Sequence, residues 1–183
     1  MQGQLIKDDG QTGVATSDYD AIVIGAGISG LYQLHRLRAL GMHVRVFETG
    51  TGVGGTWYWN RYPGARFDSE SWSYGYSFSK ELLDEWDWKE HFSPQPDTLE
   101  YLNLVADKFD LRRDIQFNSL VKSAHYQEDT RSWDVSLEDG RKYTSRYLVT
   151  AVGVLSAATL PSIPVLRASR ASLATLITGR RSR

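Results

Sequence analysis

The apolar and polar positions between residues 19 and 48 follow two periods in turn. An apolar run, 21–24, leads directly into the motif Gly-x-Gly-x-x-Gly at 25–30. Leucines then recur at helical spacing up to residue 40, and Gly41 follows at the position where many helices end. A second apolar run, 43–47, ends at Glu48. The pattern predicts a strand, a helix over Ile28 to Leu40 and a second strand, which together form a βαβ unit.

The middle of the chain contains two further helical patterns. Residues 79–88 begin with polar residues and end in two tryptophans, which predicts a helix. Asp97 and Glu100 are spaced as a capping box, so the next helix is expected to run from Asp97 to about Phe109.

The last part of the domain has strand periodicity. The predicted strands are 115–117, 120–126, 133–137 and 142–149. The last of these runs into the apolar stretch that ends at Gly153, and in a doubly wound sheet such a strand end lies beside the nucleotide. We therefore predict an α/β domain with a parallel sheet and a small antiparallel β excursion.

Residues 49–79 follow neither period. This segment is rich in glycine and aromatic residues. Loops of this length inside a domain are usually functional. The glycines favour a backbone that approaches a ligand, whereas the alternative interpretation is an aromatic cluster packed beneath a loop.

The motif Gly-x-Gly-x-x-Gly, placed after a strand and before a helix, indicates a dinucleotide site with a Rossmann-like fold. Gly25 allows the tight turn, Gly27 lets the backbone approach a pyrophosphate, and Gly30 lets the helix pack close to the strand. The helix N-terminus offers unpaired N–H groups to the phosphates. Glu48, 18 residues after Gly30, is placed to bind the ribose hydroxyls. A glycine-rich turn without a ligand is the alternative.

Composition and charge exclude several classes of protein. The 183 residues are 41% apolar and 23% charged, as in a globular domain. The chain has no cysteine, which excludes disulfides and thiolate chemistry, and its four histidines lack the spacing of ligands, so we expect no metal. Residues 165–183 hold five arginines and no acid, so the rest of the chain is acidic, which argues against a nucleic-acid partner.

The hydropathy pattern also bears on location. No apolar run reaches the roughly 18 residues that cross a bilayer. Residues 1–18 are polar and lack the apolar core of a signal peptide. We therefore expect a flexible leader over 1–18, no membrane association and a cytoplasmic protein.

Together these motifs resemble the N-terminal FAD-binding part of the Baeyer–Villiger monooxygenases, which are class B flavoproteins. The run Gly-Gly-x-Trp-Tyr-Trp-Asn-Arg-Tyr-Pro-Gly at 54–64 is highly specific. The resemblance covers residues 19–164, which we expect to form the FAD-binding domain. The residues that carry it are Gly25, Gly27, Gly30, Glu48, the run 53–66, the run 68–71 and the strand end 148–153.

The resemblance implies an enzyme that converts ketones to esters or lactones with FAD, NADPH and O₂. NADPH reduces the flavin, which captures O₂ as a peroxide that attacks the ketone. Asp68 is implied to be catalytic, because it would fix an arginine that stabilises the peroxide anion. Glu48 is implied to bind the adenosine ribose, and Arg66 to Asp68 to border the nicotinamide. The implied cofactor-binding residues are Gly25, Gly27, Ile28, Ser29, Gly30, Glu48, Gly55, Thr56, Trp57, Arg66, Asp68, Tyr74, Val121, Ala151 and Gly153.

Several parts of such an enzyme do not occur in the 183 residues. The resemblance implies a second Gly-x-Gly-x-x-Gly for NADPH, a catalytic arginine and a C-terminal part of the substrate pocket. We therefore expect a truncated part that is inactive by itself. Residues 165–183 contain no aromatic or acidic residue, and we interpret them as an aberrant tail translated out of frame. A natural basic tail that forms an amphipathic helix for a membrane or a partner is the alternative.

Two other functions remain open. One is a related flavin monooxygenase that hydroxylates nitrogen or oxidises sulfur, and the aromatic run argues against it. The other is a stand-alone FAD-binding module without enzymatic activity.

Overall fold

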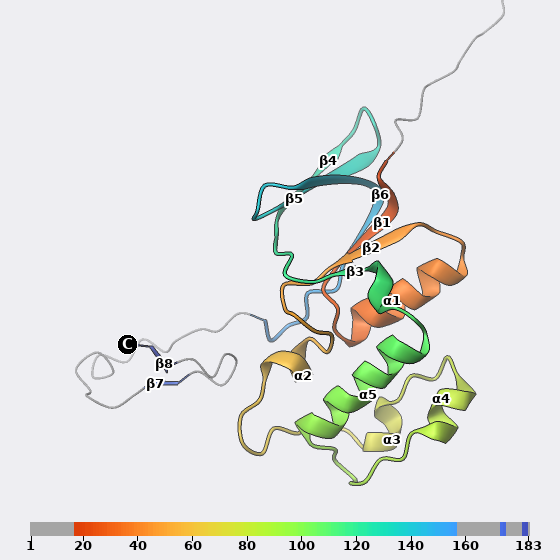
Figure 1. Ribbon diagram of the computed structural model, residues 1–183, viewed down its shortest axis with the longest axis vertical. Helices are drawn as coiled ribbons and strands as arrows, with labels where there is room; N and C mark the ends of the chain where they lie inside the picture. Colours follow the sequence, from red (N-terminus) through yellow and green to blue (C-terminus); the bar gives the residue numbers. More distant parts are fainter. Residues whose placement is uncertain (1–16, 157–172, 175–180, 183) are drawn as a thin grey trace, which may run out of the picture.

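The computed structural model describes residues 17–156, 173–174 and 181–182 (Figure 1). The expected leader over 1–18 and the expected aberrant tail over 165–183 lie almost entirely outside the described residues. No helix in the described part is long and apolar enough to cross a membrane.

One mixed sheet organises the upper part of the molecule in Figure 1, in the order β3-β2-β1-β6-β5-β4. The first four strands of this order are parallel, and β5 and β4 extend the sheet as antiparallel neighbours. The strands are β1 (Tyr19–Ile24), β2 (Val44–Phe47), β3 (Ile115–Gln116), β4 (Val121–Gln127), β5 (Ser132–Leu137) and β6 (Lys142–Thr150). The predicted parallel sheet with an antiparallel excursion is confirmed. A separate antiparallel pair joins β7 (Leu173–Ala174) to β8 (Arg181–Ser182).

The helices lie on one side of this sheet and below it in Figure 1. They are α1 (Ile28–Ala39), α2 (Thr56–Trp59), α3 (Ser71–Tyr74), α4 (Lys80–Glu85), α5 (Gln95–Lys108) and the 3₁₀ helix η1 (Arg112–Asp114). The α1 helix packs on β1 and β2, and α2 packs on α5. The segment 49–79 was expected to have no regular structure, but α2 and α3 each form one helical turn there.

Gly41 ends α1 in the predicted way. Gly41 has φ +79°, its N–H bonds to the Arg38 carbonyl at 2.9 Å, and the Met42 N–H bonds to the Leu37 carbonyl at 3.2 Å. These two bonds are those of a Schellman motif, which favours glycine at the left-handed position. Because the helix stops here, β2 begins at Val44 and pairs at once with β1.

The capping box predicted at Asp97 is wrong. The α5 helix begins at Gln95 with Pro94 as its N-cap, so Asp97 lies inside the first turn. The Gln95 N–H is held by the Ala65 carbonyl at 2.9 Å, a contact from outside the helix that no local pattern reveals. An acid in the first turn still stabilises the helix through its dipole. The predicted helix 79–88 is also shorter, because α4 ends at Glu85.

The hydrophobic core has two parts, one on each face of the sheet. The larger part joins α1 and α5 to the inner face, with Leu31, Leu34 and Leu102 among its fully buried members. The smaller part joins Ile22 and Phe47 to Val135 and Leu137 of β5. The antiparallel excursion therefore curls over the face of the parallel sheet that the helices leave uncovered.

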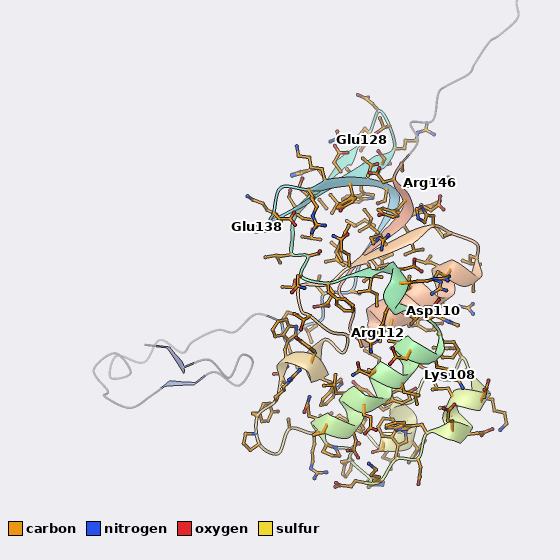
Figure 2. All side chains as sticks on the ribbon, in the orientation of Figure 1. Lys108, Asp110, Arg112, Glu128, Glu138 and Arg146 are labelled. Atoms are coloured by element: carbon orange, nitrogen blue, oxygen red, sulfur yellow. The ribbon has the colours of Figure 1, made fainter. Side chains whose placement is uncertain are left out.

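Charged side chains lie on the outside of this framework (Figure 2). Lys108, at the end of α5, forms ion pairs with Glu81 at 3.0 Å and Glu85 at 2.6 Å, both on α4. Glu128 and Glu138 lie on the connections that flank β5. The Lys108 pairs join α4 to α5 at the surface, where such ion pairs contribute little to stability.

Candidate functional site: a cavity at the carboxyl ends of β1, β2 and β6

The parallel strands β1, β2 and β6 end at the same edge of the sheet (Figure 1). Residues at these strand ends line a cavity of about 510 Å³. In open α/β sheets this is the position where ligands bind. Its walls come from the β1–α1 turn, the end of β2, α2, α3, the β3–β4 connection and the segment after β6. The lining residues are Ile24, Gly25, Gly27, Ile28, Ser29, Phe47, Glu48, Thr49, Gly54, Gly55, Thr56, Trp57, Trp59, Asn60, Tyr74, Leu120, Val121, Ala151, Val152, Gly153, Leu155 and Ser156.

The β1–α1 turn requires glycine at two of its three motif positions. Gly25 has φ +100°, and a Cβ atom there would lie 2.6 Å from the Ala151 carbonyl oxygen. A Cβ atom at Gly30 would lie 1.9 Å from the Gly25 carbonyl oxygen. Gly30 does not line the cavity, so its part is to let α1 start directly against the turn.

Gly27 and Gly55 bring two loops together at the floor of the cavity. A Cβ atom at Gly55 would lie 2.8 Å from the Cα atom of Gly27, whereas one at Gly27 would lie 3.4 Å from the Cα atom of Gly55. Gly55 also has φ +52°. The two glycines leave bare backbone on a surface that a Cβ would otherwise fill, so a ligand can contact the main chain directly.

The N-terminus of α1 points its unpaired groups at this floor. Gly27 is the N-cap, no side chain caps the helix, and the first turn contains no acid. The first helical N–H groups have no carbonyl partner within a helix, and together they create a partial positive charge. Ile28 and Ser29 line the cavity at this end. The arrangement suits a phosphate or another anion.

Glu48 is buried at the end of β2, with 5% of its surface exposed. Its Oε2 atom accepts the Ala26 N–H at 2.7 Å, and its Oε1 atom accepts the Gly50 N–H at 2.7 Å. The carboxylate therefore ties the glycine turn to the loop after β2. Each oxygen retains a lone pair, and Glu48 lines the cavity, so it is able to accept hydroxyl groups as well.

Trp57 and Tyr74 form an aromatic wall. The Trp57 Nε1–H donates to the Tyr74 hydroxyl at 2.7 Å, and the Tyr74 ring stacks on Phe67 at 4.4 Å between centroids. Burial raises the pKa of Tyr74, and the hydrogen bond from Trp57 acts in the opposite direction. The Gln95 side-chain amide donates to the Trp57 carbonyl. The first turn of α5 thus holds α2 in place at the cavity.

A second group of lining residues is apolar and more exposed. It consists of Leu120 and Val121 from the start of β4, with Val152 and Leu155 after β6. The side chains of Leu120, Val152 and Leu155 are between 49% and 56% exposed. Ala151 is positioned by the parallel pairing of β6 with β1, since its N–H bonds to the Ile24 carbonyl at 2.9 Å.

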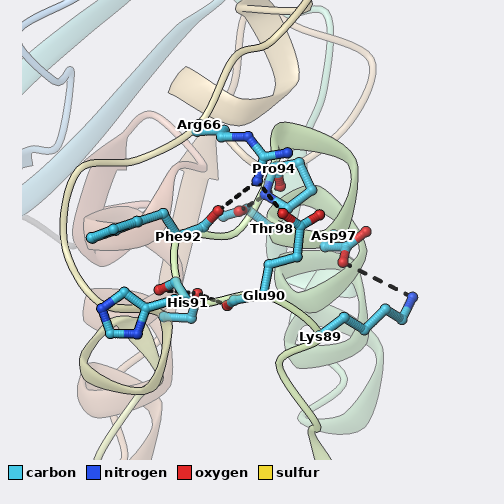
Figure 3. A network of polar contacts seen from close by, with 9 residues as sticks. Arg66, Lys89, Glu90, His91, Phe92, Pro94, Asp97 and Thr98 are labelled. Carbon is cyan, nitrogen blue, oxygen red and sulfur yellow. Dashed lines mark hydrogen bonds and ion pairs between the residues drawn. The ribbon is translucent and has the colours of Figure 1, made fainter.

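Arg66 and Asp68 do not line the cavity. Figure 3 shows Arg66 turned towards the segment before α5, where its Nη1 atom donates to Glu90 Oε2 at 2.5 Å and to the Phe92 carbonyl at 2.8 Å. Ser71 adds hydrogen bonds from its hydroxyl to the Glu90 and His91 carbonyls. Arg66 therefore joins two loops, and Asp68, two residues further along the chain, is exposed.

The remaining residues predicted from the sequence come together in the cavity. They are Gly25, Gly27, Ile28, Ser29, Glu48, Gly55, Thr56, Trp57, Tyr74, Val121, Ala151 and Gly153. Sequence reasoning did not single out Phe47, Thr49, Trp59, Asn60 or Leu120, which also line it. A signal for Asn60 was its place in the aromatic run, and it is buried there with its side-chain amide on the Thr56 carbonyl at 2.9 Å.

Residues 23–82 match the family described as an NAD(P)-binding Rossmann-like domain. A Baeyer–Villiger monooxygenase of Pseudooceanicola batsensis is 51% identical over 79% of this chain and 27% of its own length. Cyclohexanone 1,2-monooxygenase of Acinetobacter is 51% identical over 80% of this chain and 27% of its own length. This chain is homologous to part of the Baeyer–Villiger monooxygenases.

The similarity to these proteins extends to a solved structure and to a further relative. The crystal structure of cyclohexanone monooxygenase from Rhodococcus sp. Phi1, bound to NADP⁺, superimposes on this chain with a TM-score of 0.83 at 45% identity. The match covers 87% of this chain and 30% of the chain in that structure. Phenazine N-monooxygenase of Lysobacter antibioticus is 50% identical over 80% of this chain and 27% of its own length. The chain thus spans about a quarter of the length of the curated Baeyer–Villiger monooxygenases and related proteins that it matches.

Proposed function

We propose that this chain is the FAD-binding part of an NADPH- and O₂-dependent Baeyer–Villiger monooxygenase, which converts ketones to esters or lactones. The observation that carries the proposal is the combination of an uncapped α1 N-terminus with the buried Glu48 in one cavity at the carboxyl ends of the parallel strands. A cytoplasmic location is part of the same proposal.

The residues of the cavity fit a dinucleotide that contains a flavin. The α1 N-terminus and the bare backbone at Gly27 and Gly55 suit the diphosphate. Glu48 suits a ribose, because it lines the cavity at the end of β2 and each of its oxygens retains a lone pair. Trp57 and the apolar wall around Val121 suit an aromatic ring system.

FAD supplies the oxygen chemistry when it is bound and reduced by NADPH. The residues of this chain bind and orient it. Trp57, held by Tyr74 and Gln95, fixes one wall. We further propose that Asp68 orients a catalytic arginine from a part of the enzyme outside the 183 residues, and that Arg66 borders the nicotinamide when that part is in place. Their exposed positions beside the cavity loops are compatible with contacts to another part of an enzyme.

The described residues provide one dinucleotide cavity, whereas the proposed activity needs two dinucleotides. We therefore expect the 183-residue chain by itself to bind FAD and not to oxidise NADPH in the presence of a ketone. Oxidation of NADPH by the purified chain with a ketone present would contradict this expectation.

The substrate is a separate question. Relatives that are 47–51% identical to this chain are named for a simple ketone such as acetone or cyclohexanone, for a ring ketone attached to coenzyme A, and for phenazine. Similar identity across such different substrates suggests that other parts of these enzymes select the substrate. Oxygenation of a ring nitrogen is the second candidate, which the 50% identity to phenazine N-monooxygenase favours.

The test of the proposed function is FAD binding by the parent chain and by Gly27→Ala. A methyl group at Gly27 meets the Gly55 Cα at 3.4 Å, an ordinary contact, so the variant is expected to fold. It covers the backbone that a pyrophosphate would approach, so FAD should no longer co-elute with the protein. Unchanged FAD binding by Gly27→Ala, or a folded parent without FAD affinity, would contradict the proposal.

A further inference from the structure

Aromatic side chains form a continuous line of ring contacts that begins in the cavity. Trp57 and Tyr74 line the cavity, and their ring centroids lie 5.7 Å and 4.4 Å from that of Phe67. Phe67 lies 5.9 Å from Trp88, and Trp88 lies 5.6 Å from Trp86. Trp86 and Trp88 are both partly exposed. The line therefore connects a nearly buried indole at the cavity with two indoles that reach the surface.

A branch of this line continues through tyrosines. Tyr101 lies 5.1 Å from Trp88 and 5.4 Å from Trp86, and it contacts Tyr76 at 6.0 Å. Tyr76 in turn contacts Tyr32 at 6.4 Å, and Tyr32 is 38% exposed. Most rings of both routes lie in or against the larger part of the hydrophobic core, which joins the helices to the sheet.

Tryptophan and tyrosine are the side chains of this cysteine-free protein that lose one electron most readily. A phenol must also release its proton when it is oxidised near neutral pH. Burial raises the pKa of Tyr74, Tyr76 and Tyr101. The Tyr76 hydroxyl donates to the Ile28 carbonyl, which is a weak base. The indoles are therefore the better carriers, and Phe67 links two of them as a bridging ring.

Trp86 has a further property that suits this use. Its Nε1–H is buried and has no hydrogen-bond partner among the described residues. An oxidised indole without a proton acceptor keeps its proton, so the charge is not trapped on a neutral radical and remains able to move.

We propose that Trp57, Trp88 and Trp86 form a one-electron path that carries oxidising equivalents from the cavity to solvent. The proposal rests on the proposed function, because the oxidant is a flavin held in the cavity and excited by light. One electron passes from Trp57 to the flavin. Trp88 then donates an electron to the oxidised Trp57, and Trp86 donates one to the oxidised Trp88. A dissolved one-electron reductant then reduces the oxidised Trp86. In the net reaction the flavin gains one electron, the reductant loses one, and no covalent bond changes.

The experiment is flash photolysis of the full chain loaded with FAD, without oxygen, in the parent and in Trp88→Phe. The measured quantity is the lifetime of the bleached flavin absorption after a blue flash. In the parent the charge moves away from the flavin, and the return is slow. In Trp88→Phe the charge stays on Trp57, next to the flavin, so the lifetime should fall several-fold.

Trp72→Phe is the matched control, because Trp72 is 68% exposed and belongs to none of these ring contacts. It should have the parent lifetime, and equal flavin content and ground-state spectra exclude a change in binding. Trp86→Phe tests the path if Trp88→Phe does not fold, and it should also shorten the lifetime. Lifetimes equal to that of the parent in the folded path variants, with flavin bound, would overturn this inference alone. A parent that folds without retaining FAD would overturn the proposed function and this inference together.

Discussion

The buried carboxylate of Glu48 gives the sharpest test of how the cavity is held together. The substitution Glu48→Gln keeps the shape of the side chain and removes its charge. In the parent both carboxylate oxygens accept backbone N–H groups, from Ala26 and from Gly50, each at 2.7 Å. The amide of glutamine has one acceptor and one donor end. One of the two backbone N–H groups must then face another N–H group.

The magnitude follows from these two bonds. Loss of one hydrogen bond to a charged group lowers the free energy of unfolding by about 1.5–3 kcal/mol, and an unpaired buried N–H adds about 1–3 kcal/mol. Removal of a buried charge acts in the opposite direction. We expect a net loss of about 2–4 kcal/mol, which corresponds to a decrease in Tm of about 4–16 °C in a domain of this size.

The assay is thermal unfolding of the chain without FAD, followed by far-UV circular dichroism. Glu138→Gln is the matched control, since Glu138 is exposed and such surface changes shift stability by about 0.5 kcal/mol or less. If the Tm of Glu48→Gln equalled that of Glu138→Gln, the reasoning would be refuted, because the hydrogen bonds of the carboxylate to Ala26 and Gly50 would then contribute nothing to stability.

Three further predictions concern other parts of the structure. Gly30→Ala places a Cβ atom 1.9 Å from the Gly25 carbonyl oxygen, so we expect a loss of about 3 kcal/mol or more in a chemical unfolding curve. Gln95→Leu leaves the Trp57 carbonyl without its donor and should lower the free energy of unfolding by about 1–3 kcal/mol. Burial and the charges of Arg36 and Arg38 lower the pKa of His35. As the pH falls below about 6.5, the unfolded state therefore binds more protons than the folded state, and the free energy of unfolding should decrease.

Each of these predictions has its own control. Gly27→Ala should be much less destabilised than Gly30→Ala, and equal losses would contradict the packing argument. Gln95→Glu also lacks the donor, so retention of parent stability in it would show that the bond to Trp57 is unimportant. His35→Phe should lose part of the decrease in stability between pH 7 and pH 5, whereas His125→Phe, at an exposed position, should retain it.

Local patterns in the sequence were sufficient for the βαβ unit and for the antiparallel strands. Gly41, which ends α1, is identified by the left-handed turn that it must adopt, and that turn depends only on neighbouring residues. The spacing of the glycines before α1 was also recognisable in the sequence, although the contacts of Gly25 with Ala151 and of Gly27 with Gly55 join distant segments. The position of Ala151 beside Gly25 also follows, because the apolar stretch 147–153 at the end of the last strand suits the centre of a sheet. In the structure that strand, β6, ends at Thr150. The out-of-frame origin of residues 165–183 stays a prediction, and the coding DNA decides it.

Contacts between distant segments decided what the local patterns missed. The start of α5 depends on the Ala65 carbonyl, so the capping box at Asp97 was a misleading signal. Arg66 turns towards Glu90 rather than the cavity because the loop before α5 lies beside it. The line of aromatic rings exists only after α5 packs against α2 and the loops around it. The hydrogen bond from Gln95 to Ala65 and the ring contact between Phe67 and Trp88 join residues more than 20 positions apart. Such contacts have no periodicity along the chain, so only the tertiary structure reveals them.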